Sequence, residues 1–424
     1  MKSTERRLIA GVILLLIMGG AGIVLNILSP SLAYANSDSK AASVDKSIVS
    51  SNTDFAVKLL RELQREQGGK NIFISPLSVS IALAMTHDGA NSSTRQAMAS
   101  VLGFTGMSDE AVNTGFSQLI ESLLSVDKDV SLNIGDSVWI RSDFAPSVKQ
   151  NFTTTLSKYF RSEAYTKPFD ASTVNEVNSW VNKATNGKIS KLIDQIDSSN
   201  VMFIINAIYF KGGWVDKFDP TLTHQADFTT VNGSTVSVDM MSRDGSYSYY
   251  GDDQVQIARL PYGRDKIAMY VFLPAEGNSL ESFTSGLTGD ELNAYFGKLT
   301  DTELVVGLPK LKLEYGKVDL KDALTSLGMG VAFNKNLADL SRIANVSPGN
   351  NLYIAFVDHK AVVEVNEQGT EAAAATNVGI SITAMPVRTT FVVNRPYMFV
   401  IRDDRSGAIL FSGLIMEPTI QASP

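Results

Sequence analysis

Residues 366–390, near the C-terminus, most constrain what this chain can fold into. They connect an apolar run at Ala361–Val365 with another that starts at Phe391, and both runs are typical of β-strands. About 25 residues lie between the runs, and compact domains rarely contain so long a connection unless it is functional or disordered. The connection therefore points to a function and not to a simple turn.

The same connection has the period of a half-buried strand. From Thr370 to Ile382 the even positions carry small or apolar side chains, and the odd positions carry polar or very small ones. Gly369 precedes this stretch and offers a flexible pivot. Alanines 372–375 are small enough to pass between two existing strands. An alanine-rich helix and a flexible linker remain the alternatives at this point.

The composition is that of a large globular protein. Of 424 residues, 44% are hydrophobic and 19% are charged, which is enough apolar material for a large core. The net charge of -7, with no Lys or Arg block beyond the N-terminus, argues against nucleic-acid binding and against a heparin-like cofactor. The absence of cysteine excludes disulfides, thiolate metal sites and cysteine nucleophiles.

The N-terminus is typical of an exported protein. A basic start precedes the apolar stretch Leu8–Leu28, and Ala33-Tyr34-Ala35 fits the small-x-small rule for signal peptidase. We expect residues 1–35 to be a signal peptide and the mature protein to be secreted to the extracellular space. The alternative is that Leu8–Leu28 stays as an anchor on the outer face of the cell membrane, since a stretch of this length can span a bilayer. Residues 36–51 read as a flexible leader.

The remaining patterns predict an α+β fold with mixed sheets, because helical patterns dominate the first 200 residues and strand patterns the rest. Asp54 is a plausible N-cap for a first helix. Ser75-Pro76 begins another helix, in which Leu77–Met85 is apolar almost all round and should be buried. The strand candidates are 201–210, which should be covered on both faces, and 267–273, 304–308, 352–357, 361–365, 391–402 and 408–415.

No sequence motif of an active site is present. The chain lacks a G-x-S-x-G elbow, an H-E-x-x-H helix and a phosphate-binding loop. Its three histidines, His87, His224 and His359, are far apart, so a histidine-based metal site has little support. We therefore predict no enzyme, no metal site and no cofactor. A secreted hydrolase remains an alternative, because a Ser-His-Asp triad needs only one histidine.

Several segments together resemble the serpin family of serine protease inhibitors. Their number and order make the resemblance specific, and it covers residues 52–418 as a single domain, followed by a tail at 419–424. The chain is most similar in kind to an inhibitory, secreted, prokaryotic member. The segments are Asn71–Ser78, Asn178–Ile189, Asn206–Trp214, Leu308–Lys310, His359–Ala361, Glu367–Ala375, Asn394–Pro396 and Phe411–Gly413.

The resemblance implies a fold of about nine helices around three β-sheets, with a reactive-centre loop at about 367–390 and a metastable native state. A serine protease would cleave this loop, form an acyl-enzyme, and be carried along as the loop inserts into the main sheet. A non-inhibitory serpin that binds or carries another molecule is the alternative. The inhibitory hinge is expected at Glu367, Gly369, Thr370, Glu371, Ala372, Ala373, Ala374 and Ala375.

The family spacing also places the scissile bond. Counting forward from Gly369 gives Thr383-Ala384, and counting back from Asn394 gives Met385-Pro386, so Ile382 and Met385 are the alternatives to the first pair. The bait suits an elastase-like or subtilisin-like protease. We expect a monomer that binds no nucleic acid and touches a membrane only if the N-terminal segment is retained.

A last implication is a polar cluster where the main sheet opens. It consists of Ser75, Ser78, Asn206 and His359, with Trp214 at the top of the opening. Buried polar groups need hydrogen-bond partners, so a change of partners in this cluster would let two strands separate.

Overall fold

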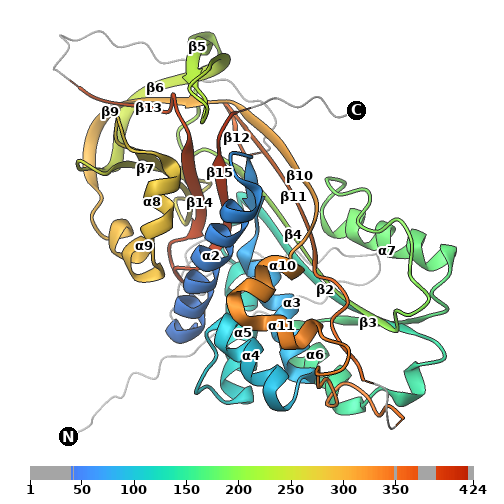
Figure 1. The fold of residues 1–424 in the computed structure, drawn as a ribbon. Coiled ribbons are helices and arrows are strands. Elements are labelled where there is room, and N and C mark those ends of the chain that lie inside the picture. Colours follow the sequence, from blue (N-terminus) through green and yellow to red (C-terminus); the bar gives the residue numbers. More distant parts are fainter. Residues whose placement is uncertain (1–39, 42, 348–350, 371–387, 419–424) are drawn as a thin grey trace, which may run out of the picture.

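The computed structural model describes residues 40–41, 43–347, 351–370 and 388–418. The α+β fold is confirmed, with helices packed around two hydrogen-bonded sheets (Figure 1). The predicted signal peptide or anchor at 1–35 and the tail at 419–424 lie outside the described residues. Among the helices of the described ranges, none is both long and apolar enough to cross a membrane.

The helices lie mainly in the first half of the chain. α3 forms as predicted, because Ser75 Oγ accepts a hydrogen bond from Ser78 N at 3.2 Å and Pro76 occupies the first turn. Nearly all of its side chains are buried, as its apolar sequence predicts. The α-helices are α2 (Lys46–Gln67), α3 (Pro76–Gly89), α4 (Ser92–Leu102), α5 (Asp109–Leu124), α6 (Gln150–Phe160), α7 (Ala171–Ala184), α8 (Leu280–Gly286), α9 (Gly289–Phe296), α10 (Lys321–Leu324) and α11 (Gly330–Phe333).

The first of these helices begins earlier than the sequence predicts. The expected N-cap, Asp54, lies inside α2, and the observed cap is Asp45, which accepts a hydrogen bond from Ser47 N at 2.8 Å. Ile48 is fully buried and lies so close to Gly115 of α5 that a side chain there would meet it at 2.4 Å. The predicted leader boundary at residue 51 is therefore wrong, because burial against α5 extends the helix backwards.

The sheet that contains the start of the predicted hinge is called the main sheet below, although it is the smaller of the two. It has six strands within the described residues, in the order β10-β11-β12-β4-β2-β3. Helix α7 lies over one face, and the large core with α3 lies on the other (Figure 1). The prediction that residues 201–210 are covered on both faces is confirmed. The strands are β10 (Leu311–Asp319), β11 (Asp358–Asn366), β12 (Gly369–Thr370), β4 (Met202–Gly213), β2 (Val130–Arg141) and β3 (Glu163–Lys167).

The larger sheet has nine strands within the same ranges. Two of the three implied sheets join in it, because the long β6 pairs with β5 and β9 along most of its length and with β7 at its end. Its strands are β1 (Ile72–Ile74), β15 (Ile409–Ile415), β14 (Tyr397–Asp403), β8 (Ile267–Pro274), β7 (Val255–Tyr262), β6 (Thr235–Gly251), β9 (Thr300–Pro309), β13 (Thr389–Val392) and β5 (His224–Thr229).

Two strand predictions are wrong. Leu352–Val357 is apolar but has no regular secondary structure, and it lies half-buried beside the main sheet. Residues 391–402 form two strands, β13 and β14, which pair with different neighbours. Pro396 lies between them, and a proline has no N–H to donate to a ladder. Apolar content alone therefore does not decide which residues join a strand ladder or where a strand ends.

The burial of Ile48 gives a test of where the domain begins. Ile48→Ala should lower the free energy of unfolding by about 2–5 kcal/mol, because it leaves a cavity under α5. Ser50→Ala, on the exposed side of the same turn, should change it by less than about 0.5 kcal/mol. Urea unfolding of the two variants and the parent measures both. Equal effects would show that this turn is not part of the core.

Candidate functional site

The main sheet is incomplete between β4 and β11. Among the described residues, only the two of β12 bridge these strands: Gly369 and Thr370 pair with Asn366 and Val365 on one side, and with Gly213 and Gly212 on the other. Below this bridge, the described parts of β4 and β11 have no ladder pairing with each other. A cavity of about 650 Å³, called the slot below, opens here, lined by both strands, α3 and residues 351–357.

The first residues after β11 are held firmly at the upper end of the slot. Thr370 is buried, and its Oγ1 shares a hydrogen bond of 2.6 Å with the hydroxyl of Tyr262. Glu367 Oε1 accepts a hydrogen bond from Thr223 Oγ1 at 2.9 Å and lies 3.2 Å from Lys310 Nζ. The predicted hinge thus begins inside the sheet at Thr370. Its remaining residues, Glu371, Ala372, Ala373, Ala374 and Ala375, lie outside the described residues.

Gly369 is required at the turn into the slot. Its φ of +140° lies in a region that L side chains rarely adopt, and an added Cβ would meet Gly212 O at 2.2 Å. The sequence prediction of a pivot at Gly369 agrees with this conformation. A residue with a side chain here would push the chain away from β4.

Trp214, expected at the top of the opening, lies where the chain turns from β11 into β12. Its ring stacks on Tyr262 with a centroid distance of 4.4 Å, and its Nε1 donates to Asn366 O at 2.9 Å. Its backbone N also donates to Gln368 O at 2.9 Å. The indole therefore ties the end of β11 to β4 and β7 at the point where the chain turns into the sheet.

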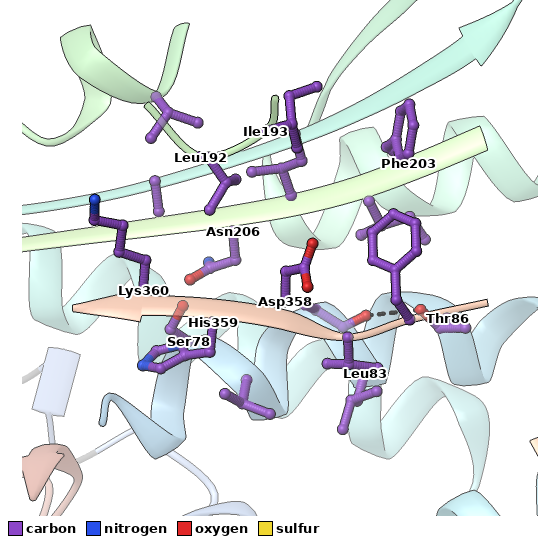
Figure 2. A pocket seen from close by; sticks show the side chains of 18 of the residues that line it. Ser78, Leu83, Thr86, Leu192, Ile193, Phe203, Asn206, Asp358, His359 and Lys360 are labelled. Atoms are coloured by element: carbon purple, nitrogen blue, oxygen red, sulfur yellow. Dashed lines mark hydrogen bonds between the residues drawn. The ribbon is translucent and has the colours of Figure 1, made fainter. Parts of the chain in front are cut away.

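The predicted polar cluster lies at two walls of the slot. On one side, the backbone N of Ser75 donates to His359 Nε2 at 3.2 Å, and Ser75 Oγ donates to Leu410 O at 2.7 Å. On the other side, Asn206 points from β4 toward the strand that holds His359 (Figure 2). Ser78 of α3 lines the floor. Three of the four predicted residues thus line one cavity, and Ser75 lies behind His359 as its hydrogen-bond partner.

The two walls are in register. His359 lies six residues before Val365, and Asn206 lies six residues before Gly212, and Thr370 pairs with both Val365 and Gly212. Asn206 and His359 therefore stand at the same level on opposite sides of the slot. A strand that continued from Thr370 would pass directly between them.

Burial determines the protonation of His359. It is buried, and this burial lowers its pKa to about 4, so the ring is neutral near pH 7. Because Nε2 accepts from Ser75 N, the proton lies on Nδ1.

Two residues of this site were not predicted from the sequence. Tyr262 bonds Thr370 and stacks on Trp214, but a tyrosine at the end of an apolar strand is an ordinary core residue in sequence. Asp136 of β2 accepts a hydrogen bond from Asn206 Nδ2 at 2.8 Å. An isolated Asp within a strand carries no spacing signal, and its partner is 70 residues away. Only the pairing of β2 with β4 brings the two together.

The predicted scissile residues cannot be placed. Thr383, Ala384, Ile382 and Met385 lie outside the described residues. In the described ranges, no group of three or more His, Cys, Asp or Glu residues could hold a metal ion.

Comparison with known proteins establishes the family. A family model described as Serpin (serine protease inhibitor) matches residues 50–418. The chain belongs to the serpin family. It is 32% identical to Serpin-ZXA from Oryza sativa subsp. japonica, over 88% of this chain and 98% of that protein. Serpins are in general protease inhibitors and not catalysts.

Solved serpin structures are similar over the same range. The thermophilic serpin tengpin in its native state has a TM-score of 0.81 and 30% identity, with 88% of this chain and 95% of that chain covered. Thyroxine-binding globulin in complex with thyroxine has a TM-score of 0.77 and 29% identity, with 88% and 99% covered. The similar serpins thus include a protein named for the ligand that it binds.

The protonation of His359 makes acid stability a test of its role. Its pKa is lowered from about 6.5 to about 4, so only the unfolded state gains this proton as the pH falls across that window. The resulting loss of stability is about 3 kcal/mol when complete. His359→Gln, which keeps an acceptor for Ser75 N, should flatten the fall in urea stability between about pH 6.5 and 4. His224→Gln, at an exposed histidine, should leave the parent's slope; an unchanged slope in His359→Gln would contradict the prediction.

Proposed function

We propose that this protein inhibits a serine protease as a suicide substrate, by inserting its cleaved reactive-centre loop into the slot. The observation that carries the proposal is the start of that strand: Gly369 and Thr370 already lie between β11 and β4, above a cavity of about 650 Å³. The unpaired strand edges on both sides of the slot supply main-chain donors and acceptors for an added strand. The slot and the hinge would therefore act together in loop insertion.

The free-energy change of insertion is large enough to drive the mechanism. A strand between β4 and β11 would gain on the order of ten backbone hydrogen bonds, each contributing about 0.5–1.5 kcal/mol net. The sum is comparable to the whole stability of an ordinary domain, about 5–15 kcal/mol. A native state that leaves the slot open is metastable with respect to the inserted state, as the mechanism requires.

The observed register predicts how each loop residue would lie. Continued from Thr370, it would set Ala374 opposite the buried Ala361 and the half-buried Ile208, on the core face. It would set Ala375 opposite the half-buried Lys360, on the other face. The small and apolar even positions of the sequence would thus face the core. This agreement between the sequence period and the strand register supports insertion.

The same register also brings a loop residue to the polar cluster. Thr376 would arrive between His359 and Asn206, where a hydroxyl can both donate and accept. The scissile bond at Thr383-Ala384 would lie thirteen residues beyond Thr370, or about 43 Å along a strand. A protease joined to Thr383 would thus be carried most of the way across the domain. Ile382-Thr383 suits an elastase-like or subtilisin-like target.

The first test is the covalent complex. Incubation with an elastase-like or subtilisin-like protease should give a complex that resists SDS, with mass spectrometry locating the bond at Thr383-Ala384. Trypsin, which prefers basic residues, is the matched negative control. Cleavage into two fragments with full protease activity would contradict the proposal.

A second test uses the two faces of the inserting strand. Ala374→Glu should convert the inhibitor into a substrate, because the carboxylate would have to enter the core beside Ala361 and Ile208. Ala375→Glu carries the same charge but would lie beside Lys360, so it should keep most of the inhibition. The measurement is the number of inhibitor molecules consumed per protease inactivated. Equal values for the two variants would contradict the proposed register.

The alternative function is a non-inhibitory carrier, which the similarity to thyroxine-binding globulin favours. A second cavity, between α2, α8 and the larger sheet, has a volume of only about 10 Å³, which is room for about one water molecule. Heat stability before and after loop cleavage separates the two functions. A large rise in Tm after cleavage supports insertion, and no rise supports the carrier.

We also propose that the protein acts outside the cell. The support is the sequence of residues 1–35, with its basic start, apolar stretch and Ala33-Tyr34-Ala35. N-terminal sequencing of the protein from culture medium and from membranes separates cleavage after Ala35 from a retained anchor.

A further inference from the structure

Behind the wall of the slot lies a buried carboxyl group that the inhibitory mechanism does not require. Asp136 of β2 is only 4% exposed and is the register partner of Asn206. Asn206 Nδ2 donates to Asp136 Oδ1 at 2.8 Å. Among the described residues, Asn206 Oδ1 is buried and has no hydrogen-bond partner. An ionised carboxylate would leave this amide oxygen without a donor and would itself be poorly compensated.

A proton on Asp136 would resolve both problems. A carboxylic acid has one O–H donor in addition to its acceptor oxygen, so it can donate to Asn206 Oδ1 while it accepts from Asn206 Nδ2. The amide and the acid then satisfy each other as a closed pair. Burial raises the pKa of Asp136 to about 7, although the hydrogen bond from Asn206 opposes this shift. The proton is therefore present at mildly acidic pH and is lost in the weakly alkaline range.

Neighbouring charges do not account for the raised pKa of Asp136. The shift in the pKa of Asp136 has burial and the Asn206 bond as its causes. Strands β3 and β4 flank β2, helices α5 and α7 pack against it, and α3 packs against β4. The titratable side chains on these elements are Glu163, Tyr165, Lys167, Tyr209, Lys211, Asp109, Glu110, Glu121, Glu176, Lys183, His87 and Asp88.

We propose that Asp136 is a positioning residue: as a neutral acid it holds Asn206 at the wall of the slot, and its ionisation loosens β4 there. Loss of the proton places a buried carboxylate beside the unpaired amide oxygen of Asn206. Separation of β4 from α3 would admit water, which lowers the free-energy cost of both groups. Opening of the slot then becomes easier as the pH rises through about 7. The consequence for loop insertion rests on the proposed function, whereas the protonation of Asp136 does not.

The sign of the effect follows from proton linkage. The native pKa of Asp136 lies above its ordinary value, so its stabilising contribution is complete at acid pH and is lost as the pH rises toward and through about 7. This is opposite in sign to the effect of His359, whose lowered pKa destabilises the native state as the pH falls toward 4. The two walls of the slot thus respond to pH in opposite directions.

The test is hydrogen exchange of β4, residues 202–213, in the full-length protein between about pH 5 and 9, corrected for intrinsic exchange rates. In the parent, opening of β4 should increase by up to about tenfold per pH unit below the native pKa of about 7 and level off above it. Asp136→Asn supplies a permanent amide donor for Asn206 Oδ1 and should make this opening independent of pH. If Asp136→Asn keeps the parent's slope, or if the parent has no slope, the proposal is wrong.

Asp88 provides a matched control. It is also a buried acid bonded to an amide, Asn113 Nδ2, at 3.0 Å, and burial raises its pKa to about 6. Its partner Asn113, unlike Asn206, does not line the slot. Asp88→Asn should therefore leave the pH dependence of exchange in β4 as in the parent. If this variant also flattened the slope of exchange against pH, the effect would not be specific to Asp136 and the proposal would be wrong.

The parent protein alone gives a second measurement if Asp136→Asn does not fold. The infrared C=O band of a protonated carboxylic acid should be present near pH 6 and disappear as the pH is raised above about 8; a band absent at pH 6 would contradict the protonation. Failure of the inhibitory mechanism would appear separately, as the absence of an SDS-resistant protease complex at every pH.

Discussion

The unpaired edges of β4 and β11 are the constraint on which the rest of the structure depends. A central position in a sheet normally has two neighbours, and here it is filled over only two residues, Gly369 and Thr370. Each strand is held from its outer side, because β2 pairs with β4 along its length and β10 pairs with β11. Within the described residues, β4 and β11 are therefore well-ordered strands that do not pair with each other below Thr370.

The polar residues along the slot hold this open arrangement in place. At the upper end, Trp214 and Tyr262 join the turn of the chain to β4 and β7. Midway down, His359 and Asn206 stand level with each other, and each has its own partner outside the slot, Ser75 for the histidine and Asp136 for the amide. Because these bonds tie each wall to its own side, breaking one of them frees a single strand. His359 on one side has a lowered pKa and Asp136 behind the other side has a raised pKa, and both shifts come mainly from burial.

Much of this architecture could be predicted from the sequence because the signals are local. The Ser75-Pro76 cap and the apolar turns after it specify a buried α3, and the run that becomes β4 is apolar enough for a strand covered on both faces. The local signals failed where a partner decides the outcome. Leu352–Val357 has the composition of a strand but forms no ladder, and its Ile354 N donates instead to Ala332 O of α11. Helix α2 begins at Lys46 because Ile48 packs closely against α5.

The sequence by itself indicated the family and predicted the hinge and the residue types around the opening, since each is carried by a contiguous motif or by a period of two. Tertiary structure alone decided that the hinge enters the sheet at Thr370, that Asn206 and His359 stand at one level, and that Asp136 lies behind Asn206. These relations join residues that are distant in the chain, and strand register fixes them. No local pattern encodes register between strands that are separated by more than a hundred residues, because it is set by burial and pairing across the whole sheet.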